Sequence, residues 1–438
     1  MEKKIGNLFK GDKGIWTVFL FLCIISIVEV FSASSTLTYH SQSYLGPILG
    51  HVSKIVIGLM VTIVILNIPC RYFKLITPML LLVTYATLVW VLFGGQSING
   101  ANRVIPLPGF TFQPSEIAKG SLVLATAQVL SAMQKPDGSG ADPLAMKYVL
   151  IMSVPAVALI GIENLSTAVL LFMVIYLMMF IARVPMIQMG KLTGVLLLIV
   201  AGFLILVFSL SKLDREGKEL EAAQKAGNLE LVKKEKAKEK KSGWDKVTHR
   251  FWTWKNRIAG EDENKDVAAS QYKVTDKNYQ VTHSNLAIAS SNIVGKGPGN
   301  SEERDYLPQA YSDFIFAIII EEMGIGGAIG VVFLYVILLF RAARIASRCE
   351  NNFPAFLIMG LTMLLVFQAA INMCVAVDFG IVTGQPLPLV SRGGTSTIIN
   401  CAYIGAILSV SRSAKRREEN GKNEEKKKVK INSELEES

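Results

Sequence analysis

Charged side chains stand at the ends of long apolar runs in this sequence, where ionisable groups are costly and often functional. Glu116 and Lys119 are three residues apart at the start of the run 114–133, so on a helix they share one face. Asp313 begins another run, 313–340. A carboxylate can accept a proton from a hydroxyl group, and cations can hold phosphate oxygens. The pattern therefore predicts a site for a phosphate-bearing lipid at a membrane surface.

Other polar groups extend this candidate site. Arg103 lies in a Pro-rich segment, expected to be a loop that caps the helices, and Arg392 lies in the segment GQPLPLVSRGG. Glu321 and Glu322 are expected two to three turns deeper than Asp313. Simpler explanations stay open, because Glu116 and Lys119 could form a structural ion pair and Asp313 could complement a helix dipole. These residues alone do not separate an enzyme from a transporter.

The elements that must position these residues are transmembrane helices. The chain has 438 residues, of which 51% are hydrophobic and 18% charged, against about 25% charged in soluble domains. Its apolar runs are continuous and about 18–25 residues long, which suits helices crossing a bilayer and excludes an alternating β-barrel. The sequence predicts an all-α, polytopic transmembrane bundle with about ten spans. The expected spans are 15–33, 50–68, 73–94, 114–133, 147–162, 165–182, 190–211, 313–340, 353–376 and 395–411.

Lysine and arginine positions predict the orientation of the spans. Basic residues crowd the N-terminus, alternate short loops and the C-terminal tail, which places both termini in the cytoplasm and makes the span count even. The net charge of +10 is mostly this topology signal, and no folded basic face for nucleic acid is visible. The predicted order is a cytoplasmic tail, seven helices, a large outer loop, three helices and a disordered cytoplasmic tail: 1–14, 15–211, 212–312, 313–411 and 412–438.

The outer loop contains a charged insertion at about 213–242 with helical propensity, expected to be a solvated helix or linker. The segment 244–258 mixes tryptophans with basic residues, which suits a helix in the headgroup layer or an ordinary packed amphipathic helix. The five cysteines and four histidines show no ligand or pairing pattern, so neither a disulfide nor a structural zinc site is expected.

Four segments together resemble the SEDS family (shape, elongation, division and sporulation), the RodA/FtsW/SpoVE peptidoglycan glycosyltransferases. They are GANRVIPLPGFTFQPSEIAK at 100–119, ENLSTAVLLF at 163–172, GKGPGNSEERDYLPQAYSDFIFAIIIEEMGIGG at 295–327 and FQAAINMCVAVDFGIVTGQPLPLVSRGGTS at 367–396. The resemblance spans about residues 15 to 412. Several positions depart from the family pattern: Asn164 replaces an Asp, Tyr311 a His and Arg392 an aromatic residue.

The resemblance implies the activity. Family members polymerise lipid II into glycan strands on the outer face of the bacterial inner membrane, release undecaprenyl pyrophosphate and work with a class B penicillin-binding protein that crosslinks the strands. The whole-chain pattern is more similar to the division branch (FtsW) than to the elongation branch (RodA). That branch implies work at the division septum with other division proteins.

The expected chemistry follows from this resemblance. Asp313 is the predicted catalytic base for the acceptor hydroxyl, in an inverting transfer that needs no covalent enzyme intermediate. Arg103, Lys119, Lys296 and Arg392 are predicted to bind the substrate pyrophosphate, with Glu116 organising Lys119. A divalent cation, Mg²⁺ or Mn²⁺, could share that task, although the sequence identifies no ligands for it. A lipid II flippase, an elongation-type polymerase and a non-catalytic scaffold for division proteins remain alternatives.

Overall fold

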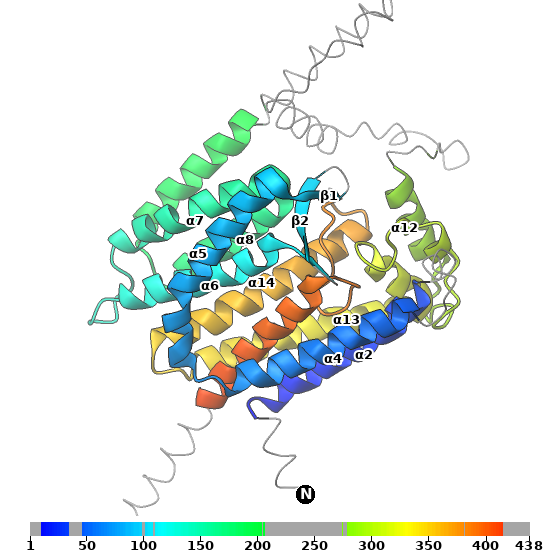
Figure 1. Ribbon diagram of the computed structural model, residues 1–438, viewed down its shortest axis with the longest axis horizontal. Helices are drawn as coiled ribbons and strands as arrows, with labels where there is room; N and C mark the ends of the chain where they lie inside the picture. Colours follow the sequence, from blue (N-terminus) through cyan, green and yellow to red (C-terminus); the bar gives the residue numbers. More distant parts are fainter. Residues whose placement is uncertain are drawn as a thin grey trace, which may run out of the picture. The chain divides into compact units, whose positions relative to one another are not determined.

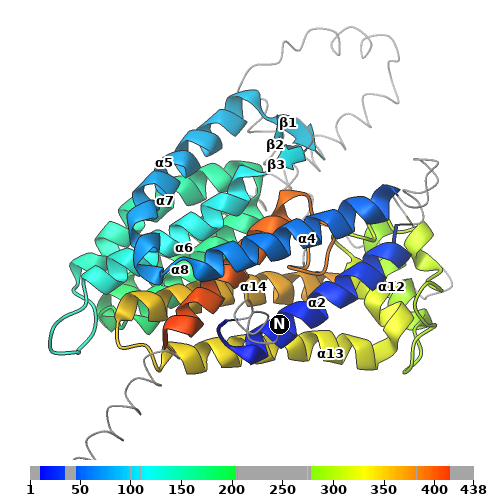
Figure 2. The same cartoon turned by 60° about the horizontal axis from the view of Figure 1, so that its bottom comes forward.

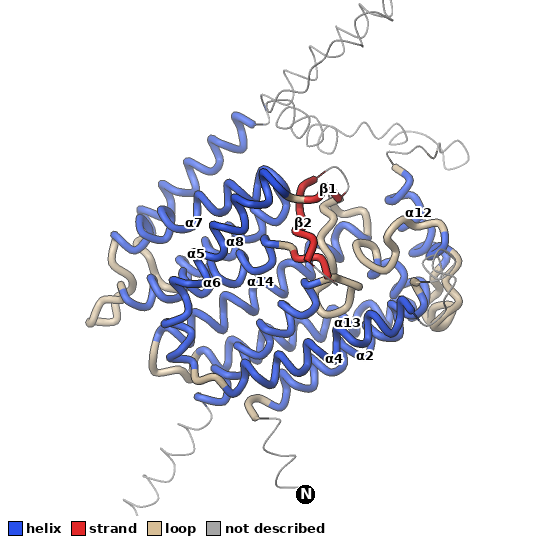
Figure 3. The backbone as a smooth tube through the Cα atoms, in the orientation of Figure 1, coloured by secondary structure: helices blue, strands red, loops and turns tan. Residues whose placement is uncertain are grey.

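The computed structural model describes residues 10–34, 46–98, 101–107, 110–203, 205, 274, 278–380 and 382–414. Helices dominate this part of the chain, with strands at one place (Figure 3). The helices are α2 Lys13–Ser32, α4 Gly46–Asn67, α5 Cys70–Gly94, α6 Pro114–Ala132, α7 Leu144–Glu163, α8 Leu165–Ile181, Met186–Phe203, α12 Tyr279–Ser290, η2 Glu303–Asp305, α13 Ile315–Ala346, α14 Asn352–Ala376 and 395–414.

The predicted all-α membrane bundle is confirmed, because each predicted span overlaps a helix in the part of the chain that the structure describes. Seven helices among the described residues are long and apolar enough to cross a membrane, and α8 is a shorter apolar helix. The chain divides into two compact units, Pro185–Thr275 and the remainder. The first of these contains the helix Met186–Phe203, which matches the start of the predicted span 190–211.

Local sequence explains where several helices begin. The Asp12 carboxylate accepts a hydrogen bond from the Ile15 backbone N–H at 3.1 Å and caps α2. Pro114 occupies the first turn of α6, where its missing N–H costs nothing. Asn164, one of the departures from the family pattern, caps α8 by accepting from the Thr167 N–H at 3.2 Å. The amide therefore keeps the capping capacity of an aspartate at this position.

Helices α2 and α13 lie side by side in opposite directions (Figures 1 and 2). At one end of the pair, Arg341 forms an ion pair with Asp12. At the other end, the Ser32 hydroxyl donates to the Glu322 carboxylate. Glu322 therefore lies beside the last turn of α2, at the end of the bundle opposite to Arg341.

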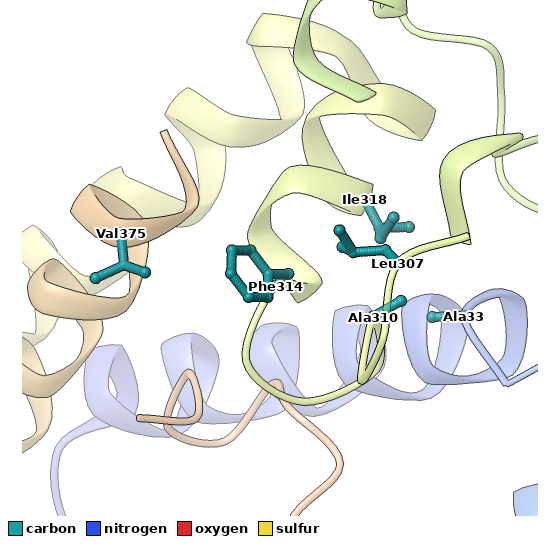
Figure 4. Close-up of a cluster of buried hydrophobic side chains, with 6 residues drawn as sticks. All are labelled: Ala33, Leu307, Ala310, Phe314, Ile318 and Val375. Atoms are coloured by element: carbon teal, nitrogen blue, oxygen red, sulfur yellow. The ribbon is translucent and has the colours of Figure 1, made fainter. Parts of the chain in front are cut away.

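A sharp kink at Gly324 divides α13. Its φ of +66° lies in the left-handed region that favours glycine. All residues from 314 to 322, before the kink, are buried. Phe314 and Ile318 pack there with Leu307, Ala310, Ala33 and Val375 (Figure 4). The kink corrects the expectation that Glu321 and Glu322 lie two to three turns deeper than Asp313 in a continuous span.

The segment around Arg103 was expected to be a Pro-rich loop and instead forms a small antiparallel sheet of order β1-β2-β3. Its strands are β1 Gln96–Ile98, β2 Ala101–Leu107 and β3 Phe110–Phe112. β-Branched and aromatic residues favour these strands. Pro106 lies in the part of β2 that pairs with β3 only, and β1 pairs with earlier residues of β2. Proline is tolerated there because it has a neighbouring strand on one side only.

Several predictions concern residues that the structure does not describe. The charged insertion 213–242, the segment 244–258 and residues 415–438 of the predicted disordered tail lie outside the described residues. The boundaries given for tails and outer loop therefore remain predictions. Within the outer loop, α12 and residues 291–312 are described and fold against α13 and α14.

Candidate active site

Glu116 and Lys119 form an ion pair, as their spacing on α6 predicts. Lys119 Nζ lies 2.9 Å from Glu116 Oε1, and Lys119 is fully buried. The ammonium also donates to Gln368 Oε1 on α14 at 2.7 Å. The Tyr403 hydroxyl donates to the Glu116 backbone carbonyl. Lys119 is thus enclosed by α6 and α14 and has no exposed surface for a ligand.

Two amide side chains of α14 connect this ion pair to Asp313. Gln368 and Asn372 are four residues apart, so they lie one above the other on the same helix face. Gln368 Nε2 donates to the Pro386 carbonyl at 3.0 Å. Asn372 Nδ2 donates to the Asp313 carbonyl at 2.8 Å and to the Gln385 carbonyl at 2.7 Å. The same face of α14 therefore fixes Lys119, the 385–386 backbone and the Asp313 backbone.

The loop from 384 to 392 reaches into the bundle beside Asp313. The Tyr335 hydroxyl donates to the Pro388 carbonyl, and Ser26 Oγ donates to the Val390 carbonyl at 2.7 Å. Ser26 lies nearly two turns inside the end of α2. Non-helical backbone at such depth is tolerated where protein groups satisfy it. Leu389 has a φ of +66°, a conformation that this surrounding structure must maintain.

Asp313 is held by its backbone, with its carboxylate partly accessible. Its N–H donates to the Gln309 carbonyl at 3.2 Å, while Asn372 binds its carbonyl. Ser312 Oγ donates to Asp313 Oδ1 at 2.9 Å. The neighbouring loop approaches closely, because a Cβ at Gly384 would stand 3.4 Å from Asp313 Oδ2. This arrangement can present a carboxylate in a fixed position.

Arg392 contacts Tyr311, two residues before Asp313, and both Arg392 and Tyr311 are departures from the family pattern. The Arg392 N–H donates to the Tyr311 carbonyl at 2.9 Å, and the guanidinium carbon lies 5.4 Å from the Tyr311 ring centroid. Arg392 Nη1 is buried and has no hydrogen-bond partner among the described residues. Burial lowers the pKa of the Arg392 guanidinium, while Tyr311 acts in the opposite direction. A poorly solvated cation with a spare donor favours binding of an anion.

Lys296 lies in a different cluster, built around the kink of α13. Its ammonium lies 2.9 Å from Glu321 Oε1 and 3.2 Å from Glu302 Oε2. The hydrogen bond to Glu321 raises the pKa of Lys296, partly opposed by burial. Backbone N–H groups of Gly299 and Ser301 donate to the Glu322 carboxylate at 3.0 and 3.3 Å. The two glutamates therefore bind the 295–302 loop, and Lys296 is engaged in holding it.

The remaining predicted groups are only partly placed. The Arg103 backbone belongs to β2, and its side chain lies outside the described residues. Among the described residues, no group of three or more His, Cys, Asp or Glu side chains could hold a metal ion. The Mg²⁺ or Mn²⁺ prediction is therefore untested. The structure brings Arg392 to Tyr311, two residues before Asp313, and connects Lys119 and Glu116 to the Asp313 backbone through α14. Lys296 has other partners.

Sequence comparison decides the family. The profile of the FtsW/RodA/SpoVE family, described as "Cell cycle protein", matches residues 12–219 and 249–416. The chain belongs to this family. It is thereby a multi-pass membrane protein of the SEDS class and, as an enzyme, a peptidoglycan glycosyltransferase.

Named relatives agree with this assignment. A probable peptidoglycan glycosyltransferase FtsW of Halomonas elongata is 28% identical over 83% of this chain and 81% of that protein. Peptidoglycan glycosyltransferase MrdB of Escherichia coli K12 is 24% identical, over 91% of this chain and 93% of that protein.

Solved structures share the fold. A chain from a peptidoglycan synthase complex covers 93% of this chain and 99% of its own length, with a TM-score of 0.66 and 20% identity. Thermus thermophilus RodA has the same coverages, with a TM-score of 0.59 and 20% identity. At these identities the likeness concerns the fold alone.

Sequence reasoning missed the neutral groups that organise the site: Gln368, Asn372, Gln385 and Ser391. Ser391 Oγ donates to the Ser312 carbonyl at 2.5 Å and accepts from the Leu387 N–H at 2.7 Å. Gln385 Nε2 donates to Thr167 Oγ1 at 2.6 Å. The sequence did offer a signal for Gln368 and Asn372, because both amides lie inside the apolar run 353–376. Buried amides require hydrogen-bond partners.

Proposed function

We propose that this protein polymerises lipid II into glycan strands on the outer face of the bacterial inner membrane. The observation that carries the proposal is the Asp313 carboxylate on a backbone held by Asn372 and Gln309, in a chain of this family. The partly buried Arg392 is hydrogen-bonded to Tyr311, two residues before Asp313. The acceptor hydroxyl has too high a pKa to ionise at neutral pH. A carboxylate within hydrogen-bond reach removes this difficulty by taking the proton as the new bond forms.

The proposed reaction is a single displacement. The acceptor oxygen forms a bond to the donor sugar carbon while that carbon's bond to the pyrophosphate oxygen breaks. The proton of the acceptor passes to Asp313, and undecaprenyl pyrophosphate leaves with the electron pair. Attack from the face opposite to the leaving group inverts the configuration, so no covalent glycosyl-enzyme is required.

We assign the cations different roles according to their surroundings. Arg392 has a spare donor and is the proposed ligand of the developing pyrophosphate charge, together with Arg103. Lys119 is fully enclosed and paired, so we propose that it positions α14 with Glu116 as its organiser. Lys296 is proposed to hold the 295–302 loop against α13. A divalent cation, when bound, would supply further positive charge to stabilise the negative charge that develops on the pyrophosphate.

The proposed orientation keeps both termini in the cytoplasm and the site at the outer surface. Basic residues of several loops meet at one end of the bundle: Arg341 binds Asp12, while Arg412 donates to the Leu66 carbonyl. Arg71 and Arg348 line one cavity at that end. This clustering supports the positive-inside arrangement. Asp313 lies toward the opposite end, because its neighbour Phe314 packs in the cluster that contains Ala33, just after the last residue of α2.

We further propose a role at the division septum with a class B penicillin-binding protein and other division proteins. Relatives named FtsW support the septal role, and the fold likeness to a chain of a synthase complex supports a crosslinking partner. An elongation role remains the alternative, since relatives named MrdB also match.

The test is glycan-strand formation from purified lipid II by the purified chain with its transpeptidase partner. We expect products longer than lipid II on a gel, together with release of undecaprenyl pyrophosphate. A chain that moves labelled lipid II across vesicles without lengthening it would instead be a flippase, and the polymerase proposal would be wrong.

A further inference from the structure

A cavity of about 510 Å³ opens at the end of the bundle opposite to Asp313. Its walls come from the start of α5, the loop between α13 and α14, and the end of the 395–414 helix. Its size lies within the range of about 300–1,000 Å³ that small-molecule pockets occupy. None of the groups proposed above for glycosyl transfer lines it.

Cations converge on this cavity from two of its walls. Arg71 and Lys74 come from the first turns of α5, and Arg348 comes from the loop after α13. One carboxylate, that of Glu350, also lines the cavity. Three cations against one carboxylate give the cavity a positive balance, which favours an anionic ligand.

The N-termini of two helices add to the positive charge of the cavity. The first residues of both α5 and α14 line the cavity, and neither helix is capped by the side chain of its N-cap residue, Pro69 or Asn351. Helix N-termini present N–H groups and a partial positive charge to anions. They supplement the three side-chain cations, so the cavity has both donors and charge for a phosphate group.

The surface next to the cavity fits acyl chains. Leu75, Met79 and Leu82 follow the basic turn of α5 on one helix face and are 76%, 70% and 70% exposed. A phosphate in the cavity would therefore lie directly above an apolar strip that faces lipid. Basic pockets between helices at a membrane boundary are typical binding sites of anionic lipid headgroups.

We propose that this cavity is a binding site for an anionic phospholipid, with its phosphodiester held by Arg71, Lys74 and Arg348. Occupation of the site links the start of α5 to the α13–α14 loop. The site is separate from the proposed glycosyl-transfer site and does not depend on it.

The proposal is tested by native mass spectrometry of the full chain in detergent, titrated with phosphatidylglycerol or phosphatidylcholine. We expect a preference for phosphatidylglycerol. Each removed charge should weaken its binding about fivefold, so Arg71→Gln with Lys74→Gln and Arg348→Gln should weaken it about 100-fold. The matched control removes three exposed lysines elsewhere, by Lys135→Gln, Lys147→Gln and Lys191→Gln, and should keep the preference.

Three results would overturn the proposal. They are equal binding of the two lipids by the wild-type chain, an equal loss in the control variant, and displacement of the lipid by equimolar inorganic phosphate, which would make this a free-phosphate site. Should the triple variant fail to fold, Lys74→Gln alone at this exposed position should still weaken phosphatidylglycerol binding about fivefold. Unchanged binding in that variant would also contradict the proposal.

Discussion

Replacing Lys119 by methionine removes an ammonium that is fully buried between α6 and α14. The variant leaves the Glu116 carboxylate, 3% exposed, without its cation, and Glu116 Oε2 already has no hydrogen-bond partner among the described residues. It also leaves Gln368 Oε1 without its donor. Breaking a buried ion pair on one side costs about 3–5 kcal/mol. For a chain of 438 residues we therefore expect the melting temperature to fall by about 4 °C.

The double variant distinguishes a coupled pair from two independent residues. Glu116→Gln alone should be about as damaging as Lys119→Met, because it leaves the ammonium uncompensated. Glu116→Gln combined with Lys119→Met leaves no unpaired charge, so its loss of stability should be far below the sum of the two single losses.

The assay is thermal unfolding of each purified variant in the same detergent, followed by glycan-strand formation. Lys147→Met removes an exposed lysine and serves as control, with a change within about 0.5 kcal/mol. Lys119→Arg should retain part of the activity if pairing is the requirement. Full additivity of the two single losses would refute the coupled pair and require separate roles for Glu116 and Lys119.

Three further predictions follow from the same structure. Lys296→Met should free the 295–302 loop and increase its proteolysis, while Lys296→Arg should preserve its protection; equal cleavage of both variants would contradict the loop-holding role. Deletion of 213–242 should leave polymerisation within a few-fold, and complete loss of activity in a folded deletion variant would show that the insertion is required. A cysteine in place of the exposed Ser139 in an otherwise cysteine-free chain should resist an impermeant reagent in intact cells and react after permeabilisation, whereas labelling in intact cells would overturn the even-span orientation.

The helices were predictable because lipid imposes a simple rule on sequence. A continuous apolar run of about 20 residues has few alternatives to a spanning helix. Each predicted span overlaps a helix among the described residues. The Glu116–Lys119 pair was equally predictable from the sequence, since residues three apart on a helix share a face. These features depend on neighbours in the sequence.

Features that depend on distant residues were not predictable. The depth of the 384–392 loop rests on hydrogen bonds from Ser26 and Tyr335, which are far away in the chain. The engagement of Lys296 depends on the Gly324 kink, which brings Glu321 to the 295–302 loop. Local sequence pattern identified Lys296 as a cation but gave no information about its partner.

The amides of α14 illustrate a second limit. Gln368 and Asn372 carry no charge, so a pattern of ionisable residues does not include them, although they connect Lys119 to the Asp313 backbone. Their importance follows from the cost of burying an unpaired amide. The paired departures Tyr311 and Arg392 show the same limit, because nothing in their separate positions predicts that they contact each other.

The most direct test of the account compares Asp313→Asn with Asp378→Asn in polymerisation of purified lipid II. Both changes remove one carboxylate charge. Asp378 is exposed, accepts a hydrogen bond from Asn285 at 3.1 Å and has a φ of +58° that asparagine tolerates. We expect Asp313→Asn to bind lipid II and unfold like the wild type yet form no strands, while Asp378→Asn polymerises normally. Strand formation by Asp313→Asn at the wild-type rate would contradict the assignment of the catalytic base.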